Sequence, residues 1–122
     1  MADASDAKQE TALGDVARNI AKCRRALAQL AETCCLAERS THMGTLMGEL
    51  EALDRMADQI FENGADAKAT DGAIEQVGTV GSALGRLYAT CCTPTREKLY
   101  IIMFKALGEV HIGFWRVKGV SH

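Results

Sequence analysis

Apolar residues recur along this chain at alternating spacings of three and four, which restricts the chain to helices packed side by side at shallow angles. The longest such stripe comprises Leu13, Val16, Ile20, Cys23, Leu27, Leu30, Cys34 and Ala37. No segment shows the period-two alternation that a half-buried strand requires. The pattern therefore predicts an all-α fold.

Four segments carry this rhythm, and we expect helices at about residues 6–38, 41–62, 71–91 and 94–115 of a single domain spanning 1–122. Residues 1–5 are expected to be disordered and residues 63–70 to form a loop. Asn63 and Gly64 are a stop signal, and Pro94 suits a first helical position. Short connections make successive helices antiparallel, so the prediction is an up-down-up-down four-helix bundle with a long first helix.

The third predicted helix carries Gly78, Gly81 and Gly85 on a face beside its apolar stripe. Each glycine lowers helix propensity by about 1 kcal/mol relative to alanine. Three of them on one face predict that a neighbouring helix approaches closely there.

The fourth predicted helix has more apolar surface than one core stripe needs. At about 100° per residue, a core face is expected from Leu99, Ile102, Met103, Ala106, Val110, Phe114 and Val117. A second face beside it comprises Tyr100, Ile101, Phe104, Gly108, His111, Ile112 and Trp115. Only a narrow charged strip remains: Lys98, Lys105, Glu109 and Arg116.

Something must cover this second face, and its aromatic residues are of the types enriched at the centres of protein interfaces. We therefore expect a partner-binding surface made of Tyr100, Ile101, Phe104, Ile112 and Trp115, with a protein partner or a second copy in a homodimer as its occupant. The alternatives are cover by the overhanging end of the first helix, a fourth helix wrapped by the other three, or association with a membrane surface.

The cysteines offer a rival hypothesis. In an up-down bundle the ends of the first and third helices lie together, which brings Cys34 and Cys91 near His42 and Met43 at the start of the second helix. Thiolate, thioether and imidazole groups suit Cu(I) or Zn(II), so a soft-metal or thiol-based binding protein is the alternative function. Adjacent cysteines on a helix point about 100° apart, however, and free cysteine commonly behaves as a small buried hydrophobe.

Other function classes find less support in the sequence. A formal net charge of −2 is too near neutral for a nucleic-acid binder that works by bulk charge. No signal peptide or transmembrane segment is recognisable, so a cytoplasmic protein is expected. No phosphate-binding loop, nucleophile motif or di-iron motif occurs. We therefore predict a non-enzymatic interaction protein, an adaptor or assembly subunit that needs no cofactor.

Overall fold

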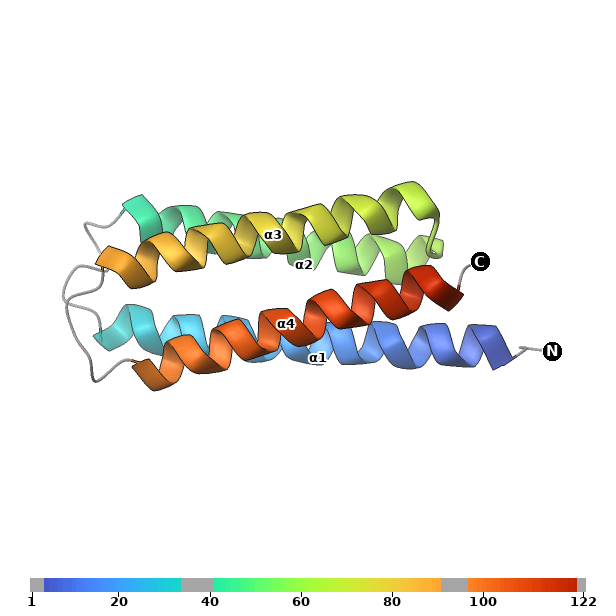
Figure 1. Cartoon of the computed structure of the whole chain (residues 1–122), viewed down its shortest axis with the longest axis horizontal. Coiled ribbons are helices and arrows are strands. Elements are labelled where there is room, and N and C mark those ends of the chain that lie inside the picture. The colour runs from blue at the N-terminus through green and yellow to red at the C-terminus, as the bar shows by residue number, and fades with distance from the viewer. Residues whose placement is uncertain (1–3, 34–40, 91–96, 121–122) are drawn as a thin grey trace.

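The computed structural model describes residues 4–33, 41–90 and 97–120, with side-chain burial from residue 10 onward. Its four helices are α1 (Ala4–Thr33), α2 (Thr41–Asn63), α3 (Ala67–Thr90) and α4 (Glu97–Val120). They lie side by side and alternate in direction, and the N-terminal end of α1 extends past the other three (Figure 1). The most extensive packing joins α1 to α4, followed by α2 to α3, α3 to α4 and α1 to α2. The predicted all-α bundle is thus confirmed.

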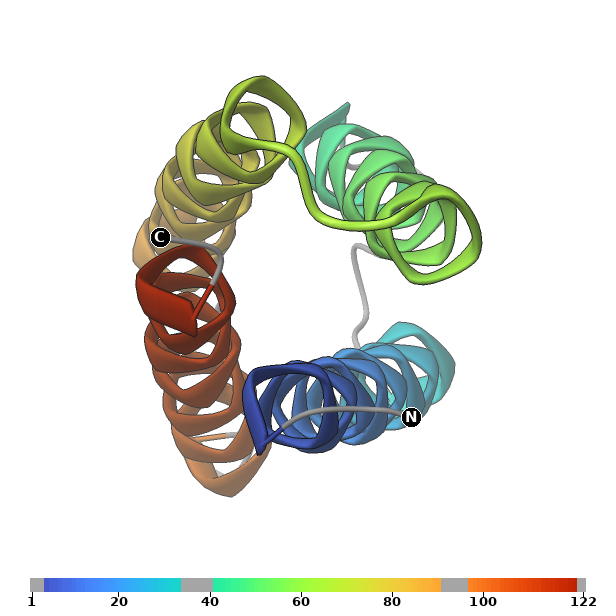
Figure 2. The same cartoon turned by 90° about the vertical axis from the view of Figure 1, so that its right-hand side faces the viewer.

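Viewed end-on, each helix occupies one corner, and α1 and α3 lie diagonally opposite each other (Figure 2). The expected stripes face the centre in α1, α2 and α3. Their buried members include Leu13, Val16, Ile20, Cys23, Leu27, Leu30, Met43, Leu46, Leu50, Leu53, Ala57, Ile60, Ala73, Val77, Val80, Leu84 and Leu87. Cys34, Ala37 and Cys91, which were expected to extend these stripes, lie outside the described residues.

The turn between α2 and α3 is shorter than the sequence suggested. Gly64 adopts a left-handed conformation (φ 89°), and its amide donates to the Ile60 carbonyl, which ends α2. Asp66 then caps α3, because its Oδ1 accepts a 2.7 Å hydrogen bond from the amide of Ala69. The helix therefore begins at Ala67 rather than at residue 71, and the loop predicted over 63–70 is confined to residues 64–66. Helix α4 continues to Val120, past the predicted residue 115, and α1 begins at Ala4, inside the stretch 1–5 that was expected to be disordered.

The core face of α4 also differs from the expected one. Tyr100 and Leu107 are buried, whereas Ile102 is exposed and Leu99 is only partly buried. The observed stripe is Tyr100, Met103, Leu107, Val110, Phe114 and Val117, which has the same three-four rhythm as the other helices. It is turned toward α3 relative to the prediction, because α4 packs against α1 on one side and α3 on the other.

The close approach predicted at the glycines of α3 is wrong. A Cβ added to Gly78, Gly81 or Gly85 would find nothing within 4 Å. The close contact lies between α4 and α1, where a Cβ on Gly113 would come within 2.5 Å of Val16 Cγ2. Gly113 thus permits the tightest helix–helix approach seen at a glycine in this bundle.

Polar contacts between helices lie at the margins of the core. Arg24 of α1 pairs with Asp54 of α2 at 2.7 Å, and the Gln76 side chain of α3 donates to the backbone carbonyl and carboxylate of Glu49 in α2. Such exposed ion pairs contribute at most about 1 kcal/mol each, so burial of the apolar stripes stabilises the bundle. Among the helices described, none combines the length and apolarity that crossing a membrane would take.

Candidate functional site

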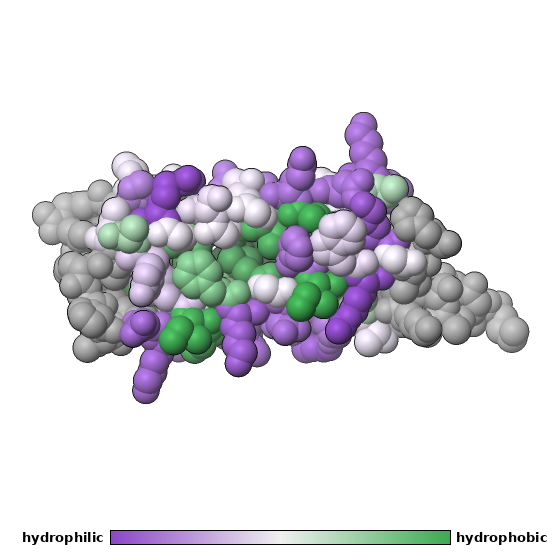
Figure 3. Space-filling view, viewed as in Figure 1, coloured by the Kyte–Doolittle hydropathy of each residue, from purple (hydrophilic) through white to green (hydrophobic). Residues whose placement is uncertain are grey.

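The side of α4 that points away from the core carries large apolar side chains in contact with solvent. Ile101 is 56 % exposed, Phe104 43 %, Ile112 44 % and Trp115 48 %. In Figure 3 apolar surface gathers along α4 and between α4 and α3, in the middle of the visible face. We call these four residues the outer face of α4. Because this helix sits at a corner of the bundle, the alternative in which the other helices wrap it is wrong.

Tyr100 does not belong to this outer face. It is only 2 % exposed, and its ring packs edge-on against Tyr88 of α3 with centroids 4.9 Å apart. The expectation that it lies on the surface with the other four is corrected: its direction on the helix points to α3, as does that of Leu107 one heptad later.

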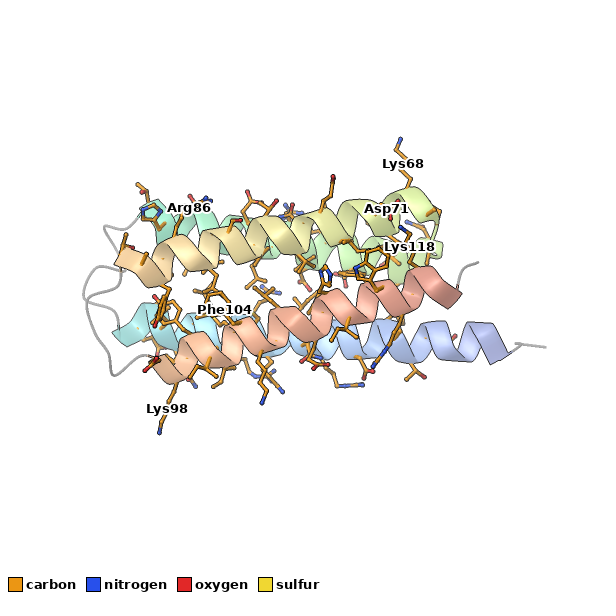
Figure 4. The ribbon with its side chains drawn as sticks, viewed as in Figure 1. Lys68, Asp71, Arg86, Lys98, Phe104 and Lys118 are labelled. Carbon is orange, nitrogen blue, oxygen red and sulfur yellow. The ribbon has the colours of Figure 1, made fainter. Side chains whose placement is uncertain are left out.

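Tyr88 extends the apolar surface from α4 onto α3. It is half-exposed, and its ring also meets Phe104 edge-on with centroids 6.4 Å apart. Figure 4 shows Phe104 projecting from α4 toward α3. Tyr88 is not among the residues predicted for this surface, and its only signal in the sequence is its position beside Leu87, just off the stripe of α3.

Trp115 is held in place by its neighbours at the other end of the outer face. Its indole N–H donates a 3.0 Å hydrogen bond to Nε2 of His111, and the ammonium of Lys118 lies 4.8 Å from the ring centroid. Lys118 also pairs with Asp71 of α3 at 2.7 Å (Figure 4). These contacts limit the rotamers of Trp115, so binding a partner would cost less side-chain entropy at this residue.

The centre of this surface is formed by glycines. Gly108 is exposed between the two bulky ends of the outer face, with nothing within 4 Å of an added Cβ. The contacts of Asp71 with Lys118 and of Tyr88 with Tyr100 set the register of α3 against α4, and they place Gly81 level with Gly108. The surface is therefore low at its middle and bulky at both ends.

The residues proposed as soft-metal ligands are only partly described. Cys34 and Cys91 lie outside the described residues, Met43 is buried in the core, and His42 is partly exposed at the start of α2. In the portion of the chain covered by the structure, no three His, Cys, Asp or Glu side chains are grouped so that they could hold a metal ion.

Cys23 is a buried thiol in the stripe of α1, and burial raises its pKa to about 12. In the unfolded chain the thiol keeps its ordinary pKa of about 9, so between pH 9 and about 12 the unfolded state loses this proton more readily than the folded state does. The free energy of unfolding therefore falls as the pH rises through this range. We expect the free energy of unfolding to decline over this window by up to about 1.4 kcal/mol per pH unit. Urea unfolding at several pH values measures it. The decline should be smaller in Cys23→Ala, and an equal decline in that variant would contradict the assignment.

A surface hollow of about 450 Å³ lies where α2 ends and α3 begins, and its lining residue Lys68 is far along the bundle from Phe104 (Figure 4). Its lining includes Met56, Gln59, Asn63, Asp66 and Lys68. The carboxylate of Asp66 is already engaged in capping α3. The Asp66 carboxylate and the exposed Lys68 ammonium are the two ionisable groups in this lining.

Comparison of the chain with protein-family models, with curated proteins and with solved structures finds no significant match.

Proposed function

We propose that this chain is a protein-interaction bundle, an assembly subunit that associates with itself through the outer face of α4. The observation that carries the proposal is the exposure of Ile101, Phe104, Ile112 and Trp115 on one side of one helix. Single exposed apolar residues are ordinary, but a contiguous group with two aromatic rings is typical of an interface.

The size of the surface supports this proposal. Helix α4 has 24 residues and is about 36 Å long. Together with the neighbouring α3 it presents a strip about 20 Å wide, or roughly 700 Å². A standard protein interface takes about 800 Å² from each partner, so this strip is close to the necessary area.

Preorganisation supports it as well. Phe104 rests against Tyr88, and Trp115 is hydrogen-bonded to His111. Aromatic side chains that are already positioned on rigid helices are typical hot spots, because binding orders them at little cost in entropy.

The alternative, a soft-metal or thiol protein that uses Cys34, Cys91, His42 and Met43, stays a prediction. Burial of the Met43 side chain in the core argues against its sulfur as an accessible ligand. Native mass spectrometry after addition of Zn(II) or Cu(I) tests this alternative, and a stoichiometric metal adduct would favour it.

Phe104→Asp is the direct test of the proposed interface. A carboxylate placed in an apolar contact must be desolvated, so we expect the dissociation constant of self-association to rise by about 30-fold or more. Light scattering over a hundredfold range of concentration measures it, and circular dichroism should show that the helices remain.

Phe61→Asp is the matched control, because Phe61 is an even more exposed phenylalanine on α2. This variant should associate as the unmodified chain does. If Phe104→Asp associates normally, or if both variants dissociate equally, the outer face of α4 is not the interface.

A further inference from the structure

The outer face of α4 and the Gly108 at its middle have a symmetric spacing. Ile101, Phe104, Gly108, Ile112 and Trp115 follow one another at spacings of three, four, four and three residues, with Gly108 at the centre. The spacing is the same in both directions along the helix, although the residues at mirrored positions differ, so this face can pack against a reversed copy of itself. An antiparallel copy of the helix therefore fits this face without a shift in register.

Resting on the proposed self-association, we propose that two copies pair through antiparallel α4 helices, with Gly108 of each copy at the two-fold axis. Ile101 then lies opposite Trp115 of the second copy, and Phe104 lies opposite Ile112. Each bulky end of the face meets the other bulky end of its partner.

The glycine centre suits this arrangement. Gly108 has open space where a Cβ would lie, and Gly81 at the same level of α3 is equally open. In the antiparallel pair these low centres face each other, so the two backbones can come close while the large side chains interdigitate on both sides. A parallel pair would instead bring Phe104 against Phe104 and Trp115 against Trp115.

The same register also determines which charged side chains meet across the interface. Lys105 and Glu109 lie on one flank of the outer face, and both are exposed. A two-fold axis perpendicular to the helices brings this flank against the same flank of the second copy. Lys105 is then displaced by only about 3 Å along the axis from Glu109 of the second copy, at a rise of about 1.5 Å per residue. Symmetry produces this ion pair twice.

The same two-fold axis brings Lys98 close to Arg116 of the second copy, at the two ends of the helix pair. These like charges oppose association. Arg116→Glu would turn both repulsive pairs into attractive ones, so the register predicts a single substitution that strengthens the dimer.

The decisive experiment uses the full chain carrying Lys105→Glu or Glu109→Lys. Each variant alone places like charges opposite each other twice, and we expect its dimer to be weaker by about tenfold, as two exposed ion pairs reversed in sign would give. An equimolar mixture of the two variants restores both pairs, because one copy is acidic at both positions and the other is basic at both. The weight-average mass from light scattering should therefore rise on mixing to that of a dimer.

Matched controls carry the same charge changes elsewhere. Lys68 on α3 and Glu62 on α2 are exposed and lie away from the outer face of α4. The variants Lys68→Glu and Glu62→Lys should therefore dimerise normally and gain nothing on mixing.

Arg116→Glu supplies the second measurement, with an expected gain in affinity of about tenfold.

The outcomes separate this inference from the proposed function. If Phe104→Asp dissociates the dimer but mixing the two charge variants restores nothing, the antiparallel register is wrong and the interface stands. Weakening of the dimer by Arg116→Glu would also overturn the register. A chain that stays monomeric over the whole concentration range would overturn both proposals.

Discussion

Replacing Phe114 with alanine is expected to lower the free energy of unfolding by about 3–5 kcal/mol, the range found when a buried aromatic ring is deleted. Phe114 is fully buried and is the largest of the fully buried side chains in the described core. The bundle has helices on both sides of this position, so the cavity can collapse only partly. Urea unfolding followed by circular dichroism measures the loss.

Trp115, the next residue, provides the contrast. Its ring is about half exposed, and we expect Trp115→Ala to cost only about 1 kcal/mol of folding stability. Its larger effect should fall on self-association, where an aromatic anchor is lost. Phe114→Ala should leave association intact at concentrations and temperatures where the variant is folded. If the two substitutions affect both properties alike, the division of α4 into a core side and an outer face is wrong.

This division could be predicted from the sequence only in part. In α1, α2 and α3 the apolar residues form one stripe each, so the helical period alone identifies the buried side. Apolar residues cover most of the circumference of α4, so the helical period is compatible with more than one choice of buried side. The positions of α1 and α3 select the stripe with Tyr100 and Leu107 and leave Ile102 outside. That selection depends on tertiary packing, which a single sequence does not contain.

The outer face of α4 illustrates the same limit. Four of the five residues expected on it are exposed, because an excess of apolar residues beyond one stripe must leave some of them outside. Tyr88 was not foreseen, since its exposure depends on how α3 is rotated against α4. The glycines were visible in the sequence, but which of them lies against a neighbour depends on the spacing between helices. The early start of α3 did have a local signal, the capping residue Asp66.

Gly113→Leu is expected to destabilise the bundle by about 3 kcal/mol, at the upper end of the usual cost of overpacking. A Cβ at this position would come within 2.5 Å of Val16 Cγ2 and 3.6 Å of the Ala12 carbonyl oxygen. Val16 is fully buried, and its β-branched side chain has few rotamers with which to move aside. Helix α4 would therefore have to shift away from α1, along the most extensive contact of the fold.

A smaller substitution identifies the atom responsible. Gly113→Ala should destabilise the unmodified chain by about 1 kcal/mol, because overpacking of up to about 3 kcal/mol exceeds the gain of about 1 kcal/mol in helix propensity. In a Val16→Ala background the obstructing methyl group is gone, and the same substitution should become stabilising by about 1 kcal/mol. Gly108→Ala is the control on the same helix: its Cβ meets nothing within 4 Å, so it should stabilise the monomer equally in both backgrounds. The unfolding free energies of the unmodified chain, Gly113→Ala, Val16→Ala and the double variant form a double-mutant cycle. A coupling energy near zero between the two substitutions would mean that Gly113 does not set the distance between α1 and α4.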